Sequence, residues 1–260
     1  DGVDRLWLNV GQGRFREAPA LALRKTSMFS MGIDFADINR DGLDDFLVVD
    51  MLNTSHRARK NQMNPRVQYQ PVPGKYNDRP QAMRNTMFLN RGYGLFSEIA
   101  NYSGVAASDW SWCPIFMDVD LDGLEDVLIT NGVERNARHL DTIIKLKKQR
   151  ESKKMTNREI LLARRVFPAQ DTPNTAFRNL GELKFTENAS QWGFDTKGVS
   201  HGMACGDLDG DGDLDIVVNN LRAAAGVYRN NAPGSRIAVR LSGPPGNTAG
   251  IGARIELEHD

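Results

Sequence analysis

Three segments of the chain place oxygen-bearing side chains at one shared spacing around a glycine. They are residues 37–45, 118–126 and 207–215, below called the first, second and third loop. In each loop the carboxylate or amide groups occupy positions one, three, five and nine, and glycine occupies position six. The twelve side chains belong to Asp37, Asn39, Asp41, Asp45, Asp118, Asp120, Asp122, Asp126, Asp207, Asp209, Asp211 and Asp215. Alternating placement turns these groups toward one point, and the glycine permits a sharp turn. The turn also brings the backbone carbonyl of position seven into range, which belongs to Leu43, Leu124 and Asp213.

A donor set of oxygen atoms alone predicts a site for a hard cation in each loop. We expect Ca²⁺ at about three sites, because a flexible loop with many oxygens suits calcium better than magnesium. An EF-hand shares positions one, three, five and six but needs a bidentate Glu at position twelve. That position holds Val48, Ile129 or Val218, so the EF-hand is excluded. An Asp- and Gly-rich turn without metal is the alternative.

The elements that must position these loops are short strands. An apolar, β-branched run follows each loop at once, which is typical of a buried strand. Between the loops a strand–turn–strand pattern recurs, as LWLNVGQGRFRE from Leu6, MFLNRGYGLFSE from Met87 and AFRNLGELKFTE from Ala176. One unit therefore has four antiparallel strands, which is the blade of a β-propeller, and the predicted fold class is all-β over residues 1–232. The phenylalanines after the turns are expected to anchor the core: Phe15, Phe96 and Phe185.

Two insertions interrupt the repeat, over about residues 51–86 and 134–170. The first is rich in Asn, Gln, Pro and Arg and is predicted to be a long surface loop. In the second, residues 134–167 carry eleven Lys or Arg against four acidic residues. Thr156 and Glu159 have the spacing of a capping box, so two short helices are expected here. On the buried side of the first helix we expect Ile143, Ile144 and Leu146.

The composition is that of a globular protein without a global charge bias. Of the 260 residues 40% are hydrophobic, and 33 basic and 33 acidic residues cancel, so neither nucleic acid nor a membrane is favoured. No run approaches the roughly 18 apolar residues of a membrane span, and no signal peptide is visible. The chain is expected to be a fragment of a longer protein. Cys113 and Cys205 lack zinc-site spacing; they are expected to be buried thiols, or alternatively one disulfide between blades.

The loops resemble the FG-GAP or VCBS repeats of integrin α-subunit propellers over most of residues 1–232. The stretch SRIAVRLSGPPGNTAGIGARIEL from Ser235 is similar to the start of an ASPIC/UnbV domain, whose signature includes a glycine-rich IGAR stretch, here Ile251–Arg254. The tryptophan common in the first strand of that domain is lacking. Residues 233–260 are therefore expected to begin a truncated β domain. Together these features resemble bacterial relatives of cartilage acidic protein. The resemblance implies a calcium-stabilised propeller, used for binding outside the cytoplasm and catalysing no reaction.

Catalytic motifs of hydrolases, zinc peptidases and P-loop proteins do not occur in the sequence. We expect a noncatalytic module that binds an extracellular or cell-surface protein or glycan, located outside the cell, on its surface or in the periplasm. The alternative is an accessory part of a secreted carbohydrate-active enzyme. The basic insertion could also bind an anionic partner, although it lacks the aromatic residues that stack on nucleic acid bases. His201 is expected to be structural, and Trp110 and Trp112 are expected to lie in the core rather than stack on sugars.

Overall fold

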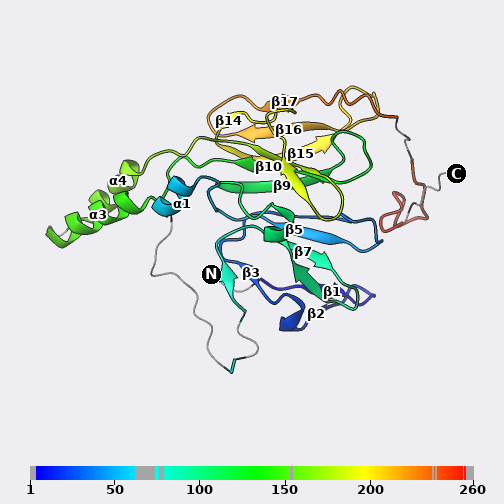
Figure 1. The fold of residues 1–260 in the computed structure, drawn as a ribbon, viewed down its shortest axis with the longest axis horizontal. Coiled ribbons are helices and arrows are strands. Elements are labelled where there is room, and N and C mark those ends of the chain that lie inside the picture. Colours follow the sequence, from blue (N-terminus) through cyan, green and yellow to red (C-terminus); the bar gives the residue numbers. More distant parts are fainter. Residues whose placement is uncertain are drawn as a thin grey trace.

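Three antiparallel sheets follow one another along the chain and form the body of the protein (Figure 1). The structure is a computed structural model that describes residues 4–62, 74–75, 79–152, 155–235, 237, 239–253 and 255. The strand orders are β4-β5-β7-β8 in the first sheet, β9-β10-β12-β13 in the second and β15-β16-β17 in the third. Their bounds are β4 Ile33–Ala36, β5 Asp45–Val48, β7 Thr86–Asn90, β8 Phe96–Glu98, β9 Ser111–Met117, β10 Asp126–Asn131, β12 Thr175–Asn179, β13 Phe185–Glu187, β15 Ser200–Gly206, β16 Asp215–Asn220 and β17 Gly226–Tyr228.

The predicted four-stranded antiparallel unit is confirmed in the first and second sheets. The third sheet has three strands among the described residues. In every sheet an acidic loop joins the first strand to the second, as the repeat predicts. Among the described sheets, the first contacts the second through β4 and β9, and the second contacts the third through β9 and β15, without closure into a ring. The all-β class is therefore confirmed at the level of strands and sheets.

The strands that follow the first and second loops, β5 and β10, are buried on both faces, whereas β16 after the third loop is only partly buried. On β5, Leu47 packs between the first and second sheets, whereas Phe46 packs on the opposite face of the first sheet. On β10, Val127 faces the first sheet and Leu128 faces the third. Alternate residues thus enter different cores, which is why these strands are continuous apolar runs without polar alternation.

Short elements connect the sheets. The pairs are β1 (Trp7–Asn9) with β2 (Phe15–Glu17) and β11 (Thr172–Pro173) with β14 (Lys197–Gly198), both antiparallel, and β3 (Thr26–Ser27) with β6 (Gln81–Ala82), which is parallel. A 3-10 helix covers Ala20–Ala22, and α2 covers Ala100–Ser103. Helix α2 ends at Gly104, whose φ of +88° suits a residue without Cβ.

The insertion over residues 51–86, predicted to be a long surface loop, contains regular structure at both ends. Helix α1 (His56–Gln62) lies within it, and β6 pairs with β3. The side chain of Gln62 is buried and bonds to the backbone of Met51 and Asn53, which ties α1 to the body. Hydrogen bonds of a polar side chain leave no periodic pattern of apolar residues, so the sequence did not predict α1. Residues 63–73 and 76–78 lie outside the described residues.

The two helices expected in the basic insertion are confirmed as α3 (Leu140–Ser152) and α4 (Asn157–Ala163), followed by a 3-10 helix over Arg164–Val166. The capping box of Thr156 and Glu159 is formed. The helices project from the body beside α1 (Figure 1). Leu146 is buried as expected, but the prediction for Ile144 is wrong, since 45% of this residue is exposed. Because α3 projects from the body, only one narrow face of the helix is buried.

Two further expectations about the core need correction. Phe185 is buried and Phe96 is half-buried, but Phe15 is 62% exposed, because no described sheet packs on the β1–β2 hairpin that carries it. Cys113 and Cys205 are both free thiols, so the disulfide is not formed. Cys205 is exposed and Cys113 is half-buried, so the expectation of two buried thiols is also wrong.

In the tail, the described residues from Pro233 onward form turns and contain no strand. The C-terminal β domain expected from the sequence therefore stays a prediction, and Arg254 and residues 256–260 lie outside the described residues. The longest described helix, α3, has 13 residues, which is too short to cross a bilayer.

Candidate metal-binding loops

The aspartate at position one closes each loop with hydrogen bonds to its backbone. Asp118 accepts from the N–H of Asp122 at 3.0 Å and of Gly123 at 2.7 Å. Asp37 accepts equivalent bonds at 3.0 and 2.7 Å, and Asp207 accepts from Gly210 and Gly212 at 2.7 and 3.1 Å. The glycine at position six has a left-handed φ of +80°, +86° and +92° in the three loops. The predicted role of this glycine is therefore met in every loop.

The aspartate at position nine is buried at the base of each loop. Asp45, Asp126 and Asp215 are at most 2% exposed. Each accepts one backbone N–H from position two of its loop and one from an asparagine at or just after the end of the next strand in its sheet: Ile38 and Asn90, Val119 and Asn179, and Leu208 and Asn230. Burial raises the pKa of Asp45 to about 6 and that of Asp126 to about 7, although both hydrogen bonds oppose the shift. A positive charge beside these carboxylates would favour their ionised form.

Positions one, three and nine bring their carboxylates together in two of the three loops. In the second loop one oxygen each of Asp118, Asp120 and Asp126 lies within 4.8 Å of the others, and the third loop does the same with Asp207, Asp209 and Asp215. In the first loop position three is Asn39, whose amide donates to Asp41 at 3.0 Å. That loop therefore offers an amide oxygen in place of the third carboxylate.

The carboxylates at position five are not part of the clusters formed by positions one, three and nine. They hold position seven in the turn instead. Asp41, Asp122 and Asp211 each use one oxygen to accept the N–H of position seven, at 2.9, 2.9 and 3.2 Å. This bond holds Leu43, Leu124 and Asp213 in the turn. Coordination by the carbonyl of position seven stays a prediction.

A comparison with known protein families matches segments that contain two of the three loops. A family model described as an FG-GAP-like repeat matches residues 1–48 and 158–218, which include the first and third loops. These two segments are therefore similar to FG-GAP-like repeats. No curated protein matches the sequence. The second loop lies between the two matched segments, yet it has the hydrogen bonds of the other two loops. The resemblance of the tail to ASPIC/UnbV and to cartilage acidic protein stays a prediction.

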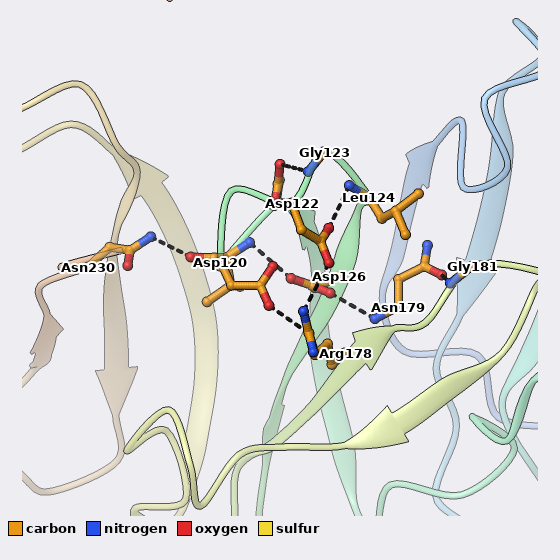
Figure 2. Close-up of polar contacts among 11 residues, drawn as sticks. Asp120, Asp122, Gly123, Leu124, Asp126, Arg178, Asn179, Gly181 and Asn230 are labelled. Carbon is orange, nitrogen blue, oxygen red and sulfur yellow. Dashed lines mark hydrogen bonds and ion pairs between the residues drawn. The ribbon is translucent and has the colours of Figure 1, made fainter. Parts of the chain in front are cut away.

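Two arginines on the hairpins after the second and third loops contact these loops, and sequence reasoning missed both. Figure 2 shows the first of them, Arg178, beside Asp120. Arg178 pairs with Asp120 (Nε to Oδ2, 2.6 Å) and with Asp122 (Nη2 to Oδ2, 3.1 Å). Arg229 pairs with Asp209 at 2.6 Å and with Asp211 at 3.7 Å. The charge of Asp120 is the main cause that raises the pKa of Arg178. The sequence signal is an arginine directly before the turn asparagine, in AFRN and VYRN.

The asparagines after these arginines also link neighbouring repeats. The amide of Asn179 donates to the carbonyl of Ile38, in the first loop, at 3.2 Å, and the amide of Asn230 donates to that of Val119, in the second loop, at 2.9 Å. Since the N–H groups of Ile38 and Val119 bind Asp45 and Asp126, the three buried aspartates are joined by one chain of hydrogen bonds. Figure 2 shows Asn179 and Asn230 on either side of the second loop.

The residues present fit a hard cation. In the second loop Oδ2 of Asp120 faces Arg178, while its Oδ1 is buried without a hydrogen-bond partner among the described residues. A bound ion or an ordered water would satisfy a buried acceptor of this kind. All donors in the loops are oxygens, which selects a hard cation over zinc or copper.

The aromatic and histidine residues considered for ligand binding have structural contacts instead. Trp110 is 7% exposed, and Nε1 of Trp112 donates to the carbonyl of Gly132. The ring of His201 packs edge-on against Trp112, with centroids 4.9 Å apart. Trp110 therefore lies in the core as expected, whereas Trp112 is half-buried and contacts the backbone and His201.

Proposed function

We propose that the chain is a noncatalytic, calcium-binding part of a β-propeller that binds a protein or glycan outside the cytoplasm. The observation that carries the proposal is the repetition of one loop geometry three times, each with a buried aspartate at its base. FG-GAP-like repeats commonly mediate extracellular interactions, which supports the location and the class of partner.

In this proposal the cation would be held by positions one, three and nine of each loop. The residues are Asp37, Asn39 and Asp45, Asp118, Asp120 and Asp126, and Asp207, Asp209 and Asp215. A bound divalent cation neutralises carboxylates that repel one another when close. The backbone bonds of position one hold the turn, and position nine ties the loop to the following hairpin. The sheets thereby present rigid loops for a partner to contact.

The proposal is tested by removing the cation. A ligand that binds the folded state alone at a hundred times its Kd stabilises it by about 2.7 kcal/mol. For a domain of this size we expect excess EDTA to lower Tm by about 5–10 °C, with calcium restoring it better than equimolar magnesium. Elemental analysis of Asp118→Asn should show one calcium fewer per chain than the wild type. Asp195→Asn, an exposed residue outside the loops, is the matched control and should lose none.

An unchanged Tm in EDTA, together with no bound calcium in protein purified without chelator, would contradict the proposal. The carbohydrate-active alternative is separated by incubating the protein with glycans and measuring released reducing sugar. Retention of a glycan without release supports a binding module, whereas release supports an enzyme.

A further inference from the structure

The arginine that contacts an acidic loop is present in the two loops where position three is a carboxylate and missing in the loop where position three is an amide. The residue before the turn asparagine is Arg178 in the second repeat and Arg229 in the third, but Leu89 in the first. The alignment of these residues is fixed by the structure, since the asparagine that follows each one donates its N–H to position nine. At position three the same loops have Asp120, Asp209 and Asn39.

The arginines contact the very residue that distinguishes the loops. Nε of Arg178 lies 2.6 Å from Asp120, and Nε of Arg229 lies 2.6 Å from Asp209, both at position three. In the first loop the acidic groups at positions one, five and nine are three carboxylates. At positions one, three, five and nine of the second and third loops, four carboxylates less one guanidinium also leave three negative charges. The charge at these four positions together with the hairpin residue is therefore the same in all three repeats, and Asp44, Glu125 and Asp213 lie outside this count.

We infer that Arg178 and Arg229 are built-in counter-cations that offset the position-three carboxylate and set the calcium affinity of the second and third loops. Each keeps the carboxylates together when the loop holds no metal, because an attraction replaces part of their mutual repulsion. The same positive charge opposes the approach of a divalent cation, so it weakens calcium binding. The part of this inference that concerns affinity rests on the proposed calcium function, whereas the part that concerns the metal-free loop does not.

A double-mutant cycle on the second loop tests the inference. The variants are Arg178→Leu, which copies Leu89 of the first repeat, Asp120→Asn, which copies Asn39, and the two together. In EDTA, Arg178→Leu should lower Tm by about 1–4 °C, as for loss of a partly exposed ion pair. The double variant should recover to within about 1 °C of the wild type, because it reproduces the charge of the first loop. Arg222→Leu removes an exposed pair with Glu134 outside the three loops, and serves as the control for losing any surface ion pair.

Calcium titration by calorimetry supplies the second arm. Arg178→Leu should bind calcium more tightly at one site, by roughly three- to thirtyfold, since a nearby positive charge is gone. Adding Asp118→Asn to this variant should abolish the gain, which assigns the site to the second loop. Arg222→Leu should leave every affinity unchanged.

The possible results separate the inference from the proposed function. If the wild type binds no calcium but the cycle in EDTA behaves as expected, the calcium function fails and the role of Arg178 in the metal-free loop stands. If calcium binds but Arg178→Leu leaves both Tm and affinity unchanged, the inference is wrong. Weaker calcium binding by Arg178→Leu would also overturn it, because Arg178 would then be a residue that positions Asp120 as a ligand.

Discussion

At the scale of single residues, each loop combines a carboxylate that is accessible to solvent with one that is buried. The aspartate at position one is partly exposed and serves the turn, whereas the aspartate at position nine is buried and serves the sheet. Burial raises the pKa of Asp45 and Asp126 far above the ordinary value near 3.8. These two groups therefore link the stability of the metal-free protein to pH.

The pKa shifts predict how pH acts on the metal-free protein. Between the unfolded pKa near 3.8 and a folded pKa of about 7, the folded state keeps a proton on Asp126 that the unfolded state loses. The stabilisation that this proton supplies is complete below pH 3.8 and is lost as pH rises through 7. Calcium favours the ionised carboxylate, so the difference in Tm between calcium and EDTA should grow from pH 5 to pH 8.

The pH prediction is checked by thermal melts of the wild type and Asp126→Asn in EDTA. The variant has no titrating group at this position, so the decline in Tm between pH 5 and pH 8 should be smaller than in the wild type. An identical decline in both proteins would show that other groups cause it.

At the scale of elements, the approach of one sheet to the next depends on a glycine at the start of the inner strand. Gly32 precedes β4, and a Cβ placed there would lie 2.4 Å from the carbonyl oxygen of Trp112 and 2.5 Å from Cδ of Pro114. Both atoms belong to β9 in the second sheet. Gly202 in β15 occupies the same place in the third repeat, five residues before the loop, and a Cβ there would meet nothing within 4 Å.

This pair predicts unequal effects of one substitution. Gly32→Ala should destabilise the protein by about 1–3 kcal/mol, because the first sheet must move away from the backbone of β9. Gly202→Ala should change stability by less than about 1 kcal/mol, since neither φ is left-handed and Gly202 has space. Urea denaturation of both variants measures the difference. Equal losses would mean that strand conformation rather than sheet contact decides the effect.

At the scale of the whole molecule, the helical insertion is joined to the body by its ends. Asn136 bonds to Gln170 at 2.8 Å, and Gln170 in turn bonds to Asn53 at 2.6 Å. Val133 and Gln170 also form an isolated β-bridge. By contrast, α3 and α4 project from the sheets (Figure 1). The insertion is thus divided into an anchored base and a projecting part.

Replacing residues 140–166 with a short Gly/Ser linker should preserve the fold, since the closure entropy of a loop grows slowly with length. We expect a soluble protein with a cooperative melt within a few degrees of the wild type. Replacing residues 133–170 should be much more harmful, because it removes the buried bonds of Asn136 and Gln170. Circular dichroism melts of the two truncations make the comparison, and loss of cooperativity in the shorter one would place α3 and α4 in the core.

The sequence by itself determined the acidic loops, the four-stranded unit and the capping box at Thr156. Each depends on residues close together in the chain: nine positions of a loop, alternate positions of a strand or four residues at a helix start. Local spacing decides which side chains can meet there, so a linear pattern carries the information. The order of strands within each sheet follows in the same way from short connections.

Only the tertiary structure decided which distant residues complete the loops and which apolar residues are buried. Arg178 reaches Asp122 across 56 positions, and Asn179 reaches Ile38 across 141. Phe15 and Phe185 occupy one place in the repeat pattern, yet Phe185 is buried while Phe15 is exposed. The physical reason is that burial and ion pairing depend on the neighbouring sheet, and a repeat specifies its own strands but not what packs against them.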